Sequence, residues 1–181
     1  MEILTKVLDN SVVTALGRDI HSVKLIPLIT SGYGITLTSD VIEECRDYEN
    51  GALLPLFASA TTIDDERVRS ISSLLKLWRP NLGKGECSAI ATSLVLTADG
   101  RKNYLVLDDG VARRCAKDAG SLPGVIKILG KKVDLNLTGT VGLVRHLYDK
   151  GLISEKDKQS IGYDLETSSF RISDDLLRLL R

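Results

Sequence analysis

Several acidic residues lie at predicted strand ends and on predicted helices, where the fold of an α/β protein could bring them together. Asp9 closes the first predicted strand, in VLDNS, and Asp108 and Asp109 close the predicted central strand, in LVLDD. Glu86 begins a predicted helix after a Gly-x-Gly turn, in GKGEC, and Glu44 lies on the helix after the second predicted strand, in VIEEC. If the first and central strands are neighbours, their acids face one another across a crevice at the carboxyl ends of the strands.

Carboxylates gathered in this way predict a metal site. They repel one another, and at neutral pH one of them would be forced to take up a proton. A hard divalent cation removes the repulsion, and Mg²⁺ or Mn²⁺ prefers such oxygen ligands while keeping several waters. An ion held there would lower the pKa of a bound water and stabilise charge on a phosphoryl group. The acids therefore predict metal-dependent hydrolysis of a phosphodiester, although each acid taken alone is also typical of an ordinary turn or helix start.

Strand and helix patterns alternate along the chain in an order that would position these acids. Short apolar runs predict strands over 2–9, 33–37, 103–109 and 124–130. Apolar residues at helical spacing predict helices over 11–29, 38–49, 63–78, 86–100 and 110–120, while 51–62 is ambiguous. In 38–49, Asp40 and Glu43 are spaced as the cap and third residue of a helix. The alternation predicts an α/β fold with a mostly parallel sheet that helices cover on both faces.

The residues after 137 have helical patterns only. These patterns lie at 140–151, 154–167 and 173–181, and Ser154 and Asp157 have the spacing of a capping box. We expect a single domain over 1–181. It would consist of an α/β core over 1–137 and a helical C-terminal extension over 138–181 that packs on the core.

The composition excludes several classes of protein. Basic and acidic side chains balance at 24 each, which argues against a protein that coats nucleic acid by bulk charge. Aromatic residues make up 4% of the chain, which argues against a platform of stacking aromatics for single strands. No apolar run approaches the roughly 20 residues of a membrane helix. Three cysteines without a C-x-x-C pair argue against a disulfide framework, and we expect a cytoplasmic protein.

Four motifs in order, VLDNSVVTAL, TSDVIEEC, GKGECSAIATS and YLVLDDGVARRCAK, resemble the PIN-domain family of nucleases. The resemblance is greatest to a prokaryotic branch related to the toxin ribonucleases of toxin–antitoxin pairs. TGTVG, KGLIS and FRIS in the tail extend it, so that it spans the chain from Asp9 to Ser173. It implies a three-layer α/β/α sandwich with a helical C-terminal tail.

The same resemblance implies roles for the acids. Asp9, Glu86 and Asp109 would be the metal ligands, and Glu44 and Asp108 would support them directly or through water. The implied activity is that of a Mg²⁺- or Mn²⁺-dependent endoribonuclease. The implied partners are RNA, a second copy in a homodimer, and an antitoxin protein whose inserted segment would block the acidic site.

Other interpretations stay open at this point. Arg113 and Arg114 follow the central acids on one helix and would meet RNA phosphates at the crevice rim, although such a helix face is more often simply solvated. A PIN-like fold without activity, serving as a binding or scaffold module in an RNA-processing complex, is the main alternative. A phosphoacceptor domain of the response-regulator type would also place acids at strand ends, but it needs a late strand-end lysine that GVIKILGKK offers only in part.

Overall fold

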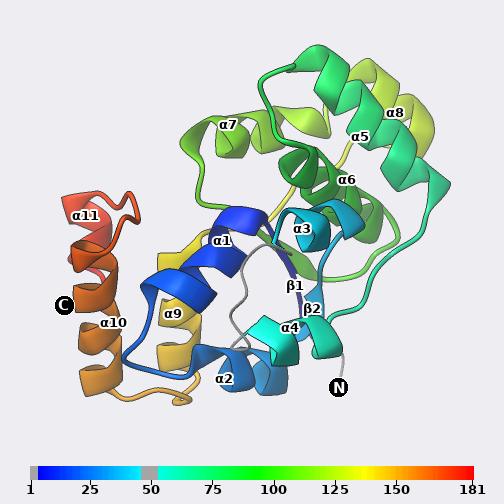
Figure 1. The fold of residues 1–181 in the computed structure, drawn as a ribbon. Coiled ribbons are helices and arrows are strands. Elements are labelled where there is room, and N and C mark those ends of the chain that lie inside the picture. Colours follow the sequence, from blue (N-terminus) through cyan, green and yellow to red (C-terminus); the bar gives the residue numbers. More distant parts are fainter. Residues whose placement is uncertain (1–3, 46–52) are drawn as a thin grey trace.

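The computed structural model describes residues 4–45 and 53–181. Within these residues, four parallel strands form one sheet in the spatial order β2-β1-β3-β4. The strands are β1 (Thr5–Leu8), β2 (Gly34–Thr36), β3 (Asn103–Val106) and β4 (Leu137–Thr138). Helices cover both faces of the sheet, so the chain is a three-layer α/β/α sandwich (Figure 1).

Each face of the sheet has its own group of helices. One face carries α5 (Glu66–Trp78), α6 (Lys84–Ala98), α7 (Gly110–Ala119) and α8 (Pro123–Leu129). The other carries α1 (Asn10–Thr14), the π-helix η1 (Ala15–Asp19), α2 (Leu25–Gly32), α4 (Leu54–Ser59), α9 (Thr140–Asp149) and α10 (Glu155–Thr167). The remaining two are α3 (Ser39–Glu44), which contacts α6, and α11 (Asp174–Leu177), which follows α10 in the tail.

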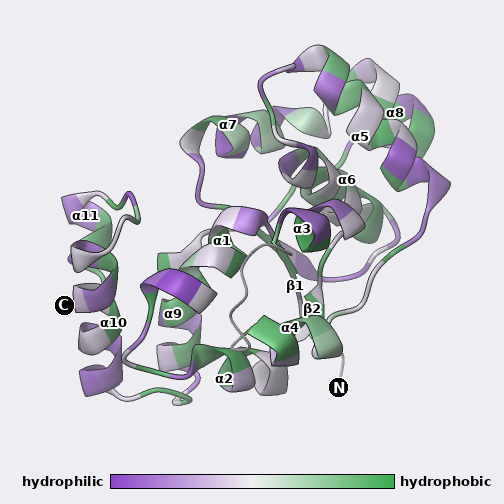
Figure 2. Cartoon of the chain, viewed as in Figure 1, coloured by the Kyte–Doolittle hydropathy of each residue, from purple (hydrophilic) through white to green (hydrophobic). Residues whose placement is uncertain are grey.

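The sheet separates two hydrophobic cores, because side chains along each strand point alternately to its two faces. Val7 and Leu105 point to the α6 side, whereas Leu8 and Val106 point to the α9 side, because successive strand residues face opposite sides of a sheet. Figure 2 shows hydrophobic residues concentrated on α2 and α4, which contact one another, and hydrophilic residues along much of α10. Both cores are therefore closed by helices whose apolar residues face the sheet.

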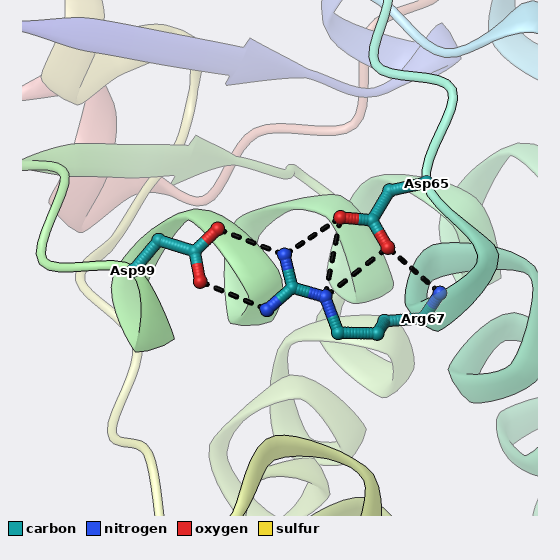
Figure 3. Close-up of polar contacts among 3 residues, drawn as sticks. All are labelled: Asp65, Arg67 and Asp99. Atoms are coloured by element: carbon teal, nitrogen blue, oxygen red, sulfur yellow. Dashed lines mark hydrogen bonds and ion pairs between the residues drawn. The ribbon is translucent and has the colours of Figure 1, made fainter.

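An arginine fastens the start of α5 to the end of α6. Asp65 caps α5 and accepts from Arg67 Nη2 at 2.7 Å, while the same guanidinium donates to both oxygens of Asp99 at 2.9 Å (Figure 3). Arg67 holds the pKa of both carboxyl groups below its usual value. The side chains are partly exposed, so the contribution to stability is about 1 kcal/mol or less for each pair, but the geometry fixes how α5 lies on α6.

The predicted strand at 124–130 is wrong: Pro123–Leu129 is helix α8. Pro123 is suited to a first helical turn, and Gly130 ends the helix in the left-handed conformation at φ 73°. Val125, Ile126 and Leu129 have the i, i+1, i+4 spacing of one helical face, which a short apolar run hides. The fourth strand is instead Leu137–Thr138, which is too short to give a sequence pattern.

The other predicted elements are close to the observed ones. The strands at 2–9, 33–37 and 103–109 correspond to β1, β2 and β3, within the described residues, and the three tail patterns correspond to α9, α10 and α11. The capping box of Ser154 and Asp157 is confirmed. Asp40 does not cap α3, because Thr38 accepts from the Val41 amide instead.

Two stretches of the chain are divided differently from their sequence patterns. The ambiguous segment forms α4 in its described part, with Pro55 in the first turn, and residues 46–49 of the predicted helix 38–49 lie outside the described residues. Between 11 and 29, the predicted helix divides into α1, η1 and α2.

No helix in the described ranges combines the length and the apolar character that a membrane crossing requires.

Candidate active site

The sheet brings the strand-end acids together. Strands β1 and β3 are neighbours, with Leu8 paired to Val106, so Asp9 and the pair Asp108–Asp109 leave the sheet at the same edge. The direction of winding reverses between these strands, which is where ligand crevices form in parallel sheets. A pocket of about 800 Å³ opens there, and acidic side chains line it: Asp9, Asp19, Glu44, Glu86, Asp108 and Asp109.

Asp9 lines this pocket and is only 2% exposed. It caps α1, and its Oδ2 accepts from the amide and the hydroxyl of Ser11 at 3.2 Å and 2.8 Å. Its Oδ1 is buried and has no hydrogen-bond partner within the described residues. Burial raises the pKa of Asp9, the Ser11 hydrogen bonds oppose the rise, and the negative charge of Glu44 adds to it.

Glu44 and Glu86 come together at the start of α6. Glu44, at the end of α3, accepts from the Gly85 amide through Oε1 at 3.0 Å. Glu86, in the first turn of α6, accepts from the Gly83 amide through Oε2 at 2.8 Å. Burial raises the pKa of Glu86, the Gly83 amide opposes this, and the charges of Asp9, Asp109 and Glu44 raise it further. These three acids of the pocket are thus close enough to Glu86 for their charges to act on it.

We call Asp9, Glu44, Glu86 and Asp109 the acidic quartet. Asp109 caps α7 through Oδ1, which accepts from the amides of Val111 and Ala112 at 2.8 Å and 2.7 Å. Each member thus uses one carboxylate oxygen to hold a helix terminus. The other oxygen of each makes no hydrogen bond to the described part of the chain. The quartet is anchored and still has four oxygens to offer a ligand.

Asp108 is arranged differently. Both of its oxygens are engaged by Thr140, with the amide donating to Oδ1 at 2.8 Å and the hydroxyl to Oδ2 at 2.6 Å. Burial raises its pKa, and Thr140 and then Arg113 oppose the rise. The preceding Gly139 has no room for a side chain, since a Cβ there would lie 2.6 Å from Asp108 Oδ1. Asp108 therefore lines the pocket while tying the end of β3 to the start of α9.

The two arginines that were predicted to contact RNA lie in different surroundings. Arg113 Nη1 donates to the carbonyls of Leu107 and Thr138 at 2.8 Å and 2.7 Å, so it bridges the ends of β3 and β4. Arg114 is exposed on α7 and lines a separate cavity beside the acidic pocket. RNA contact stays a prediction for both, with Arg114 the better placed of the two.

The quartet fits a hard divalent cation in its donor chemistry. Within the described ranges, no three acidic, histidine or cysteine side chains already stand as a preformed metal site. The orphaned Oδ1 of Asp9 and the repulsion that raises the pKa of Glu86 are the two features that a cation would relieve. All four open atoms are carboxylate oxygens, which Mg²⁺ and Mn²⁺ prefer.

The pocket also contains residues that the sequence patterns did not reveal. Asp19 ends η1 at 7% exposure, and burial raises its pKa. Ser169, Phe170 and Arg171 reach the same pocket from the tail, and Arg171 is the one cation among its described lining residues. The FRIS motif is the only sequence signal for the tail residues, and Asp19 falls within the helical pattern at 11–29, where nothing marks it as a pocket residue.

Comparison with known proteins places this geometry in a family. A family model described as a PIN domain matches residues 5–134, which include the whole acidic quartet and most of the chain. Searches of curated proteins and of solved structures found no significant match. PIN domains are generally nucleases, which hydrolyse phosphodiester bonds. On its sequence match and its fold, the chain belongs to the PIN-domain family.

Proposed function

We propose that this protein is a Mg²⁺- or Mn²⁺-dependent endoribonuclease that cleaves RNA at the acidic quartet. One observation carries the proposal. In each carboxylate of the quartet, one oxygen is hydrogen-bonded to a backbone amide or a hydroxyl, and the other makes no hydrogen bond to the described residues and is available to a ligand. RNA as the substrate is supported by the resemblance of the motif set to toxin ribonucleases.

Asp9, Glu86 and Asp109 would hold the cation, and Glu44 would support them. A bound divalent cation supplies a lowered pKa for water and stabilises charge on the phosphoryl group. The protein's own contribution is preorganisation, because the helix starts of α1, α6 and α7 fix carboxylates that would otherwise repel one another. Ser11 orients Asp9, and Gly85 orients Glu44.

Arg171 would position the substrate. It is exposed at the pocket and forms no ion pair with the described residues, and the other charged residues of the described lining are all acidic. A guanidinium matches the geometry of phosphate oxygens, so Arg171 would contact an RNA phosphate next to the one that is cleaved. The pocket volume of about 800 Å³ lies within the range of about 300–1,000 Å³ that is typical of ligand pockets.

Cleavage of a labelled single-stranded RNA with Mn²⁺ tests the proposal. Asp9→Asn keeps an oxygen that can accept from Ser11, so the variant should fold as the wild type does. We expect its cleavage rate to fall ~10²–10³-fold, the range found when one charge-stabilising group is lost. Cleavage at the wild-type rate would remove Asp9 from the mechanism. A wild-type protein that binds RNA and never cleaves it would support the inert binding module instead.

A further inference from the structure

A second cavity lies beside the acidic pocket and shares Asn81 with it. Its volume is about 420 Å³, and the end of α5, the turn at 79–82 and one face of α7 form its walls. The residues that give it chemical character are Trp78, Arg79, Val111 and Arg114. Asn81 therefore borders both cavities, which puts the second cavity within reach of a polymer that is bound in the acidic pocket.

The turn that forms one wall is held in place. Lys76 Nζ donates to the carbonyls of Pro80 and Leu82 at 2.8 Å and 2.5 Å. Leu82 is 2% exposed and packs in the core beneath α6, and Trp78 is half-buried against the same core. The cavity is therefore preformed, which lowers the entropic cost of binding a ligand in it.

The charges of this cavity are opposite to those of the acidic pocket. The Arg79 guanidinium lies over the Trp78 ring, 4.6 Å from the ring centroid. Arg79 and Arg114 form no ion pair with the described residues, although both side chains are exposed, and Asp118 is the one acid in the described lining. Two unpaired guanidinium groups beside an indole are suited to a nucleotide, which offers an anionic phosphate and a flat base.

We infer that this cavity is a nucleotide-binding subsite for the RNA strand that is cleaved in the acidic pocket. Arg114 contacts a backbone phosphate, and an unpaired base stacks on the surface formed by Trp78 and Arg79. The identity of the ligand rests on the proposed function. The low aromatic content of the chain does not oppose it, because one tryptophan at the right place is sufficient for one base.

Binding without a divalent cation tests the subsite separately from cleavage. Trp78 is the only tryptophan of the chain, so its fluorescence reports on this cavity alone. With EDTA present at low salt, a short single-stranded RNA should quench this fluorescence saturably. Arg79→Ala and Arg114→Ala should each weaken binding of the labelled RNA about 5–10-fold, and Arg114→Ala should reduce the slope of log K against log salt by about 0.7, the value for one lost phosphate contact.

Arg145→Ala is the matched control. It removes one positive charge from an exposed side chain on α9 that lines neither cavity, so we expect wild-type affinity. Equal losses in all three variants would overturn the inference, as would RNA binding that leaves the Trp78 fluorescence unchanged. Displacement of the RNA by polyglutamate at the same concentration would also overturn it, by revealing a general anion surface. If the subsite binds RNA but Mn²⁺ produces no cleavage, the proposed activity fails and the subsite stands.

Discussion

The Oε1 atom of Glu44 accepts a hydrogen bond from the Gly85 amide at 3.0 Å, which joins the end of α3 to the first turn of α6. The two residues are far apart in the sequence, and the contact places Glu44 beside Glu86. It depends on the absence of a side chain at Gly85, since a Cβ there would lie 2.6 Å from Glu44 Oε2. The position of Glu44 in the acidic quartet thus depends on the space that Gly85 leaves for its carboxylate.

Gly85→Ala should separate folding from activity. The new methyl group displaces the carboxylate of Glu44, which is the flexible end of a side chain, and the helical preference of alanine offsets the strain by up to ~1 kcal/mol. We expect thermal unfolding close to that of the wild type and RNA cleavage about 10-fold slower, by analogy with the loss of one oriented polar group. Gly124→Ala in α8 is the control, because its nearest neighbour would be the flexible side chain of Leu74 in α5 and neither residue lines the acidic pocket. Unchanged cleavage in Gly85→Ala would show that the position of Glu44 is unimportant.

Thr140 should matter for stability through Asp108. Thr140→Val removes the hydroxyl that donates to Oδ2 and leaves that oxygen without its partner in a partly buried site. We expect the free energy of unfolding to fall by ~1–3 kcal/mol, the cost of an unsatisfied polar group. Thr140→Ser keeps both hydrogen bonds, so its free energy of unfolding should fall by less. Chemical denaturation measures the difference, and equal losses in the two variants would refute the role of the hydroxyl.

A lysine in the central strand gives the fold a pH dependence. Lys6 is fully buried, and its Nζ lies 3.0 Å from His146 Nδ1. Burial, and then the charge of Lys150, lower the pKa of Lys6 to about 8. Burial and then Lys6 also lower the pKa of His146. Among the described residues, the charged and titratable groups around this lysine are His146, Lys150, Asp149, Tyr33 and Tyr104.

Stability should therefore rise with pH in the alkaline range. The folded state releases the Lys6 proton near pH 8, whereas the unfolded chain keeps it until about pH 10.5, so the unfolded state binds more protons between these values. Below pH 8 the charged Lys6 lowers the free energy of unfolding by its full amount. Between pH 8 and 10.5 the free energy of unfolding rises again by at most ~3 kcal/mol, at about 1.36 kcal/mol for each pKa unit. Denaturation of Lys6→Met should lack this rise, and exposed Lys117→Met should keep it. A wild-type protein whose stability is flat from pH 8 to 10.5 would contradict the assignment.

Arg171 should affect how the substrate is held. Arg171→Ala removes the one cation of the described pocket lining, and we expect an increase of about 10-fold in KM with a smaller change in kcat, as for a group that binds ground and transition states alike. Arg178→Ala removes an exposed charge from the same tail and should resemble the wild type. Steady-state cleavage kinetics distinguish the two, and a fall in kcat alone would assign Arg171 a different role.

Parts of this site could be predicted from the sequence, and the reasons are local. Asp9 and Asp109 follow apolar strands, and parallel neighbouring strands place their ends at one edge. The engagement of Asp108 by Thr140 could not be predicted, because it depends on β4, a strand of two residues. The segment at 124–130 forms a helix although its pattern predicts a strand, because a short apolar run fits both the helical and the strand period. Arg171 reaches the pocket only through the packing of the tail, which no local pattern encodes.

Calorimetric titration with Mn²⁺ tests most directly whether the acidic quartet binds a cation. The wild-type protein should give a saturable binding isotherm, and Asp9→Asn and Glu86→Gln should each abolish it or weaken it at least 10-fold. Asp175→Asn, which removes a highly exposed carboxylate in the tail, should bind as the wild type does. A wild-type protein that shows no binding up to millimolar Mn²⁺, or an Asp9→Asn variant that binds the ion as tightly as the wild type, would contradict the account.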